Sequence, residues 1–386
     1  MLGLYVHIPF CARKCHYCDF AITTDRSVSM RERFFKALTL EVRRAADLHG
    51  RLVFDTLYLG GGTPSEMTPE ETASVFSLLR ECFDFIPGAE ITFEMNPGDG
   101  SPRKLETLRR LGVNRISLGA QSFQDRILRT IGRIHHVGDI LQTFEMLRTY
   151  GFGNINLDLI ARLPEQSCED FEDSLRRTIA LRPEQVTVYD LDVKEGTVFG
   201  VLQARGRLVL SDEETHERMA LSTETLLKDA GYRQYELCTY ARPGFESRHN
   251  LVYWTGGHYL GFGPGAVSYM EDARFQLAAD NDTYVRKCLA KDWGSSFREV
   301  LTPQKHELEL LITLLRLEEG IDLEWFEAIR KRLETEVDLL VSGGLLERTG
   351  SRVLFSPRGR LVAEGVFAEL VGQLSPDLDR GLLGHL

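Results

Sequence analysis

The stretch LYVHIPFCARKCHYCDF, residues 4–20, joins an apolar run to three cysteines in the spacing C-x-x-x-C-x-x-C. Cys11, Cys15 and Cys18 share one short loop, so three thiolates can converge on a soft metal centre. A closed zinc site takes four ligands, and no second cysteine pair or spaced histidine pair follows downstream. In a [4Fe–4S] cluster each cysteine binds one iron, which leaves the fourth iron open to a non-protein ligand. The spacing therefore favours an iron–sulfur cluster over zinc or ordinary thiols.

The composition is that of a globular protein from a reducing compartment. Of 386 residues 43% are hydrophobic and 27% charged, which allows one large domain and a smaller one. No apolar run approaches the roughly 20 residues of a membrane span, and the N-terminus lacks the basic segment of a signal peptide. The other four cysteines are scattered. We therefore expect a cytoplasmic protein, and the net charge of −11 argues against nucleic acid as a partner.

Residues 1–240 alternate short β-rich runs with amphipathic helical patterns. Strands are predicted over 4–8, 55–59, 90–95, 115–119, 154–160 and 185–191, and helices over 31–48, 69–82, 102–111 and 140–150. Thr68-Pro69 and Ser101-Pro102 each place a capping hydroxyl before a proline, which is a helix start signal. Six βα units predict an α/β fold, a partial (β/α)6 barrel of the TIM type, with its chemistry at the carboxyl ends of the strands.

The rest of the chain changes character twice. Residues 241–300 are predicted to extend the barrel, after a helix over 212–230 and a strand over 234–240. Residues 301–375 predict an α+β region of winged-helix-like shape, with helices over 307–317 and 323–343 and a hairpin over 345–357. Between residues 301 and 370 there are 13 acidic and 9 basic residues, which favours a structural or protein-facing role over DNA binding.

Polar residues stand at the predicted carboxyl ends of successive strands. The run Gly60–Thr63 follows the second strand and lets the backbone approach a ligand, although a structural glycine turn explains it equally well. Glu94 ends the third strand, Gln121 follows the fourth, and Asp158 lies on the fifth. Three such groups beside a metal loop predict a polar ligand site at the mouth of the barrel.

Taken in order, these motifs resemble the radical S-adenosylmethionine superfamily, in which the free iron binds the methionine part of the nucleoside. Within it, the chain is similar to the anaerobic coproporphyrinogen III dehydrogenase-like family along most of its length. The matching stretches are YVHIPFC, LYLGGGTPS, FEMNPG, GVNRISLGAQSF, INLDLI, QYELCTYARPGFESRHNLVYW and GFGPGAVSY. The resemblance implies a [4Fe–4S] cluster on Cys11, Cys15 and Cys18 with S-adenosylmethionine beside it.

The resemblance also implies which residues surround the nucleoside. They are Tyr5, the backbone of Tyr17, Gly61, Gly62, Thr63, Glu94, Gln121, Arg133 and Asp158. A sulfonium, an ammonium and ribose hydroxyls need acceptors, and a carboxylate needs an arginine, so the residue types agree with the ligand. The reduced cluster of such proteins cleaves the nucleoside to a 5′-deoxyadenosyl radical, and whether this chain cleaves it or only binds it stays open.

Two departures separate the chain from the dehydrogenase itself. The dehydrogenase loop has a further cysteine where Phe20 stands, and its N-terminal extension is missing, since four residues precede Tyr5. Both departures favour the sister group of haem chaperones, which bind haem and pass it to acceptor apoproteins such as membrane-bound respiratory proteins. Oxidative decarboxylation of coproporphyrinogen III is the alternative activity. The acceptor and the formation of a homodimer are left open.

The segment His249–Tyr253 reads H-N-L-V-Y and matches the H-N-x-x-Y motif of the haem chaperones. A neutral imidazole is a good axial ligand for haem iron, and Tyr253 would supply a second ligand or a hydrogen bond to a propionate. A hydrogen-bonded core histidine is the alternative role for His249. In a last departure, Arg162 and Glu165 replace two glycines of the family pattern Y-G-L-P-G-Q, and we expect them to alter ligand access and oppose full radical turnover.

Overall fold

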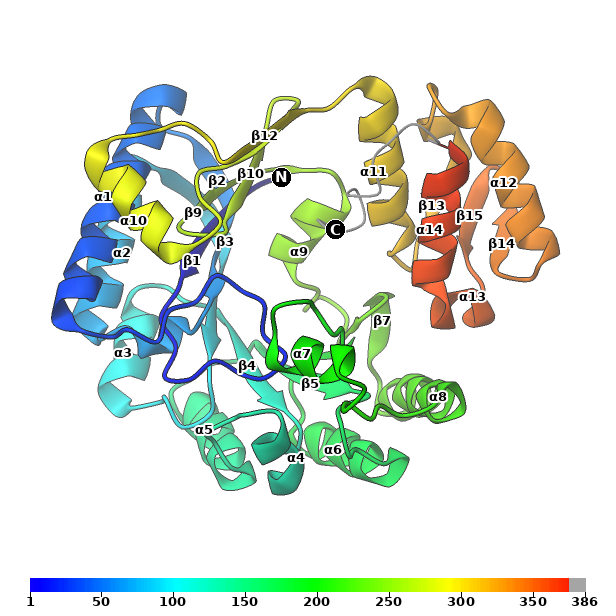
Figure 1. The fold of residues 1–386 in the computed structure, drawn as a ribbon, viewed down its shortest axis with the longest axis horizontal. Coiled ribbons are helices and arrows are strands. Elements are labelled where there is room, and N and C mark those ends of the chain that lie inside the picture. Colours follow the sequence, from blue (N-terminus) through cyan, green and yellow to red (C-terminus); the bar gives the residue numbers. More distant parts are fainter. Residues whose placement is uncertain (375–386) are drawn as a thin grey trace.

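A curved sheet of twelve strands forms the centre of this computed structural model, which describes residues 1–374 (Figure 1). Its order is β12-β11-β10-β9-β1-β2-β3-β4-β5-β6-β8-β7. Six strands follow one another in parallel: β1 Leu2–Ile8, β2 Val53–Gly61, β3 Asp84–Met95, β4 Arg115–Gln121, β5 Ile155–Ala161 and β6 Gln185–Asp190. The predicted α/β partial barrel is confirmed.

Helices between these strands cover the outer face of the sheet (Figure 1). They are α1 Val28–His49, α2 Pro69–Cys82, α3 Pro102–Arg110, α4 Asp125–Thr130, α5 Val137–Thr149 and α6 Cys168–Leu181. Parallel strands need such crossover connections. The two predicted helix starts are confirmed. The Thr68 hydroxyl accepts a hydrogen bond from the Glu71 amide, and the Ser101 hydroxyl accepts one from the Lys104 amide. Between sheet and helices lies an apolar core that includes Val6, on β1.

Beyond β6 the chain adds α7 Val198–Ala204, α8 Glu213–Asp229 and a small antiparallel hairpin of β7 Arg233–Glu236 and β8 Thr239–Ala241. The single strand predicted over 234–240 is therefore wrong. The Glu236 carboxylate accepts hydrogen bonds from the Cys238 amide and the Thr239 hydroxyl, and this local capping turns the chain back.

Residues 241–300 extend the sheet on the side of β1. The elements are α9 Arg248–Trp254, β9 His258–Phe262, β10 Val267–Met270, β11 Ala273–Gln276, α10 Asn281–Ala290 and β12 Phe297–Val300. Strand β9 is parallel to β1, and the three strands after it are antiparallel. Within the described part of the chain, no helix has the length and apolar character needed to cross a bilayer.

A second hydrophobic core lies to one side of the sheet and belongs to the last elements of the chain (Figure 1). They are α11 Pro303–Leu315, β13 Ile321–Asp322, α12 Arg330–Ser342, β14 Leu346–Thr349, β15 Arg352–Phe355, α13 Pro357–Leu361 and α14 Ala363–Leu374. The helix predicted over 323–343 begins late, because the Glu307 carboxylate accepts the amides of residues 327–329 just before α12. Residue 375 of the predicted unit 301–375 lies outside the described residues.

Candidate functional site

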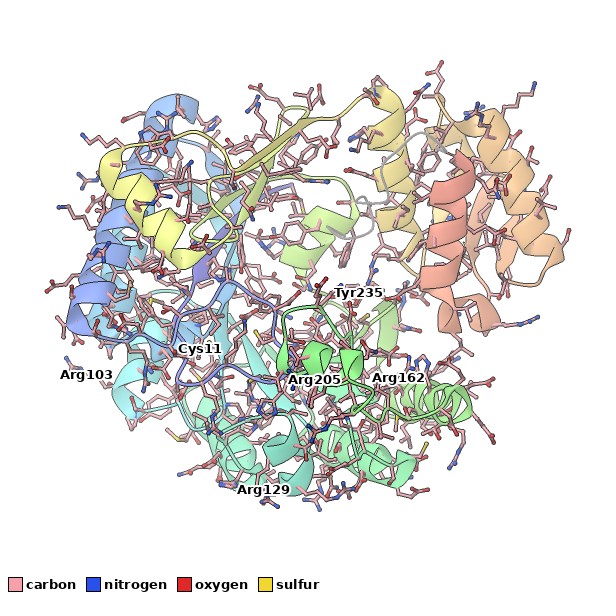
Figure 2. All side chains as sticks on the ribbon, viewed as in Figure 1. Cys11, Arg103, Arg129, Arg162, Arg205 and Tyr235 are labelled. Atoms are coloured by element: carbon pink, nitrogen blue, oxygen red, sulfur yellow. The ribbon has the colours of Figure 1, made fainter. Side chains whose placement is uncertain are left out.

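The cysteine loop and the carboxyl ends of the parallel strands enclose a first cavity of about 380 Å³. Cys11 lies on this loop, inside the ring of helices (Figure 2). Most of the predicted site residues line the cavity: Cys11, Cys15, Tyr17, Cys18, Gly61, Gly62, Thr63, Glu94, Gln121, Arg133 and Asp158. The fold thus brings together at one mouth of the barrel residues as far apart in the sequence as Cys11 and Asp158, which are separated by 147 positions.

Two of the three thiols contact the opposite wall of the cavity. The Cys11 thiol is hydrogen-bonded to the Thr63 hydroxyl at 3.3 Å, and Arg133 Nη1 donates to Cys15 Sγ at 3.8 Å. Burial raises the pKa of Cys11 to about 11 and also raises that of Cys18, so both thiols stay protonated at neutral pH until a metal displaces the proton.

The donor set suits a cluster better than a single ion. Across residues 1–374, no three cysteine, histidine or carboxylate side chains are placed to hold one metal ion. A [4Fe–4S] cluster differs, because each thiolate binds a separate iron and the three sulfur atoms stay apart. Three thiols around one cavity therefore have the chemistry for such a cluster.

The glycine run is explained by packing as well as by the cavity. A Cβ on Gly62 would lie 2.7 Å from the Pro9 carbonyl carbon, and one on Gly61 would lie 2.6 Å from the His7 ring. Gly61 also has a φ of 105°, which L side chains rarely adopt. Glycine is thus required for the end of β2 to pass close to β1.

Glu94 is a carboxylate of the first cavity that is held by two hydrogen bonds. Its Oε1 accepts from the Tyr58 hydroxyl at 2.7 Å and its Oε2 from the Gly61 amide at 3.1 Å. Burial, assisted by the nearby Asp158, raises the pKa of Glu94 to about 7. A cationic ligand would restore its charge, because an opposite charge favours the ionised carboxylate.

Asp158 and Gln121 supply further acceptors. Asp158 accepts from Asn156 Nδ2 at 2.7 Å and from Ser117 Oγ at 3.2 Å, and burial raises its pKa. Gln121 Oε1 is buried without a hydrogen-bond partner in the described structure, and its residue has a left-handed φ of 65°. An unpartnered buried acceptor on strained backbone in a cavity wall is a feature that a hydroxyl or ammonium of a ligand would satisfy.

Asn96, which lines the first cavity, and Tyr58, which stands behind Glu94, were not among the predicted site residues. Asn96 links two predicted residues, since its Nδ2 donates to Thr63 Oγ1 at 3.1 Å and its Oδ1 accepts from Arg133 Nη2 at 2.6 Å. Tyr58 holds Glu94. Asn96 stands two positions after Glu94, so the period of two along a strand is a signal that could have found it.

A second, larger cavity of about 720 Å³ adjoins the first. The two share Asp19, Phe20, Gly61 and Glu94 in their walls. Tyr5, predicted to flank the nucleoside, lines this second cavity, as does Tyr253. Whether Tyr5 contacts the nucleoside stays a prediction.

His249 is a buried residue of α9 with both ring nitrogens occupied. Nδ1 is hydrogen-bonded to the Thr56 hydroxyl at 2.7 Å and Nε2 to the Tyr253 hydroxyl at 2.8 Å. Burial lowers the pKa of His249 to about 3, so the ring is neutral. Within the described chain it lines neither cavity, and iron ligation by His249 would require one of these hydrogen bonds to break.

Arg162 and Glu165 keep the backbone of the glycines they replace. Their φ angles are 61° and 65°, in the left-handed region. Arg162 lies away from Cys11 (Figure 2) and its Nη2 pairs with Glu213 of α8 at 3.4 Å. Since neither residue belongs to the walls of the two cavities described, the expectation that they alter ligand access finds no support.

Comparison with known proteins assigns the family. The family model of the Radical SAM superfamily matches residues 5–178, and that of the HemN C-terminal domain matches residues 301–362. The chain is 33% identical to the heme chaperone HemW of Bacillus subtilis over 97% of this chain and 100% of that protein. It is 32% identical to the heme chaperone HemW of Mycobacterium tuberculosis (strain ATCC 25618 / H37Rv), over 96% of this chain and 95% of that protein.

A solved structure agrees with these relatives. The coproporphyrinogen III oxidase (HemN) from Escherichia coli, a radical SAM enzyme, superposes with a TM-score of 0.84 at 25% identity, over 96% of this chain and 89% of that one. The fold, the order of the motifs and the near-complete coverage of the relatives lead to one assignment. The chain belongs to the heme chaperone HemW family of the radical SAM superfamily.

Proposed function

We propose that this protein is a cytoplasmic haem chaperone, which binds haem and transfers it to acceptor apoproteins such as respiratory proteins at the membrane. The names of its relatives support haem as the cargo. The observation that carries the proposal is the junction of two cavities, one lined by three thiols and nucleoside-type acceptors and one larger and rich in aromatic side chains. A redox-active cofactor and a flat cargo would thus be held side by side.

The first cavity would hold the resident cofactors. Cys11, Cys15 and Cys18 would bind a [4Fe–4S] cluster, which when bound supplies one electron to the sulfonium of S-adenosylmethionine. Glu94 and the unpartnered Gln121 oxygen would accept hydrogen bonds from the nucleoside and hold it in one orientation. The protein groups orient the ligand and exclude water from it.

A second candidate function is oxidative decarboxylation of coproporphyrinogen III. The likeness of the whole fold to the coproporphyrinogen III oxidase from Escherichia coli favours it. Assay of the anaerobically reconstituted chain with coproporphyrinogen III separates the two functions. Formation of protoporphyrinogen would establish the decarboxylase, and haem uptake with subsequent transfer to an apo-acceptor would establish the chaperone.

The cluster assignment is tested by substitution of the thiols. We expect Cys11→Ser, Cys15→Ser and Cys18→Ser each to lose the iron, the visible absorbance and the EPR signal of the reduced cluster after reconstitution. Cys82→Ser is the matched control, because Cys82 is a free, half-buried thiol on α2 outside both cavity walls of the described chain. Full cluster content in a Cys11→Ser protein would contradict the assignment.

A further inference from the structure

The second cavity is built at the boundary between the two hydrophobic cores. Strands β1, β9, β10 and β11 contribute one wall, and helices α9 and α11 contribute another. Its volume of about 720 Å³ falls within the roughly 300–1,000 Å³ of sites for ligands of cofactor size. The cavity is thus large enough for a tetrapyrrole.

The walls of this cavity suit a flat apolar ring with acidic substituents. Six aromatic side chains line it: Tyr5, Phe20, Tyr253, Trp254, Tyr259 and Tyr269. Phe20, at the junction with the first cavity, is 60% exposed and offers an apolar face to a ligand. The Trp254 indole N–H is buried and has no hydrogen-bond partner in the described structure, and a carboxylate such as a propionate would supply one.

One face of α11 forms the wall opposite the sheet. His306, Glu309, Leu310 and Thr313 line the cavity, at the spacing that places residues on a single helix face. Glu309 fixes this face, because both its oxygens are bonded to Arg274 of β11, at 3.1 Å from Nη1 and 2.5 Å from Nη2. The pair is largely buried, and a bidentate contact of this kind sets the helix in one position.

His306 is the histidine of this wall with a nitrogen left for a ligand. Its Nδ1 is hydrogen-bonded to the Tyr269 hydroxyl at 2.9 Å, whereas its Nε2 has no hydrogen-bond partner within residues 1–374. When Nδ1 carries the proton and donates it to Tyr269, Nε2 presents its lone pair. A second group on the far nitrogen is the usual means of orienting a metal-binding histidine.

We propose that the second cavity is the haem site and that His306 Nε2 is an axial ligand of the haem iron, oriented by Tyr269. The inference rests on the proposed chaperone function and adds to it the location and the ligand of the cargo. Haem iron takes a neutral imidazole, and the aromatic walls receive the faces of the ring. No redox or bond-breaking step in the tetrapyrrole is part of this proposal.

This placement gives the H-N-x-x-Y motif a different role from the predicted one. Tyr253 stands in the cavity wall with its hydroxyl bonded to His249, and His249 is in turn bonded to Thr56 behind it. The motif therefore positions one aromatic wall of the haem site. His249 acts through Tyr253 and is a positioning residue.

The test is a haem titration of the full-length protein with its cluster reconstituted, followed by absorbance and EPR. We expect His306→Ala to shift the haem spectrum and to weaken binding by about tenfold or more, since it removes an iron–nitrogen bond. Added imidazole should restore the wild-type spectrum, which a merely structural role of His306 would not allow. Tyr269→Phe should keep the ligand and show a smaller spectral shift.

His258→Ala is the matched control. His258 is exposed and its ring lies 5.4 Å from that of Tyr269, but it is not in the described wall of either cavity. Wild-type affinity and spectrum in His306→Ala would overturn the placement while leaving the chaperone function intact. Absence of haem binding by the wild-type protein would overturn the proposed function itself. Thermal unfolding and iron content establish that each variant is folded and loaded.

Discussion

At the scale of single residues, Glu94 links ligand binding to pH. Its pKa is about 7 in the folded chain against 4.5 ordinarily, with burial as the main cause. The folded state thus keeps a proton that the unfolded chain has lost. The stability from this group is fully present below pH 4.5 and is lost as the pH rises through about 7.

Glu94→Gln removes this titration. We expect the ligand-free variant to lose less stability between about pH 5 and about pH 8 than the wild type, by on the order of 1–3 kcal/mol. Urea unfolding at both pH values measures the effect. The variant should also bind S-adenosylmethionine more weakly, because an amide does not pair with an ammonium.

Glu41 provides the control for Glu94. Its pKa is also raised by burial to about 7, and its carboxylate accepts from the Tyr284 hydroxyl at 2.7 Å and the Gly263 amide at 2.9 Å. It lies outside the walls of both cavities in the described chain. Glu41→Gln should therefore flatten the pH profile without changing nucleoside affinity. Equal loss of affinity in both variants would contradict the role given to Glu94.

His249 has a structural cost that any haem measurement must take into account. His249→Ala removes two buried hydrogen bonds and a ring stacked on Tyr58, so we expect it to destabilise the fold by about 2–4 kcal/mol. Chemical denaturation of the haem-free protein measures this loss. A cost below about 1 kcal/mol would show that the chain Thr56–His249–Tyr253 does little for the fold.

At the scale of elements, the loop after β5 stores strain in two left-handed residues. Arg162 and Glu165 have φ angles of 61° and 65°, and a side chain in this region costs roughly 1–2 kcal/mol. We expect Arg162→Gly and Glu165→Gly each to stabilise the protein by about 0.5–1 kcal/mol, after the greater freedom of glycine in the unfolded chain is subtracted. Urea unfolding decides the sign.

Alanine variants separate backbone strain from side-chain contacts. Arg162→Ala keeps a Cβ and loses the pair with Glu213, so it should bring no gain. Glu165→Ala keeps a Cβ and loses the contact with the Thr130 hydroxyl. Glycine variants no more stable than the alanine variants would show that the left-handed conformation costs nothing here.

The elements that could be predicted are those with local signals at their ends. Helix α2 matches its predicted range, Pro69–Cys82, because Thr68 and Glu71 cap each other's backbone. The break between β7 and β8 could not be predicted, because it depends on how the Glu236 side chain folds back on the next residues. Strand ends followed by polar residues likewise located the first cavity.

The second cavity escaped prediction for a physical reason. His306 belongs to a helix of the second core and meets the sheet through its own hydrogen bond to Tyr269 and through the neighbouring pair of Glu309 with Arg274. No spacing in the sequence encodes a contact between two separately packed cores. Within the motif His249–Tyr253, Tyr253 lines the second cavity, whereas His249 is buried outside its wall.

At the scale of the whole molecule, α11 belongs to both halves of the structure. Leu308 and Leu311 are buried in the second core, whereas His306 and Glu309 line the cavity against the sheet. The exposed ion pairs of Arg233 with Glu318 and Glu319 also join the two parts, but exposed pairs contribute little. The buried pair of Arg274 with Glu309 and the hydrogen bond of Tyr269 to His306 join them at the second cavity, and a ligand there would add a further link.

This coupling predicts where ligands protect the chain from hydrogen exchange. Haem at about 100 times its Kd stabilises the state that binds it by about 2.7 kcal/mol. Because the site spans both cores, we expect protection in α9 and in α11 together, while S-adenosylmethionine on the reconstituted cluster should protect residues 11–23 and 61–63. In His306→Ala the haem-dependent protection of α11 should fall. Protection by haem confined to the barrel strands would contradict a site between the cores, because a ligand that does not contact α11 has no means of stabilising it.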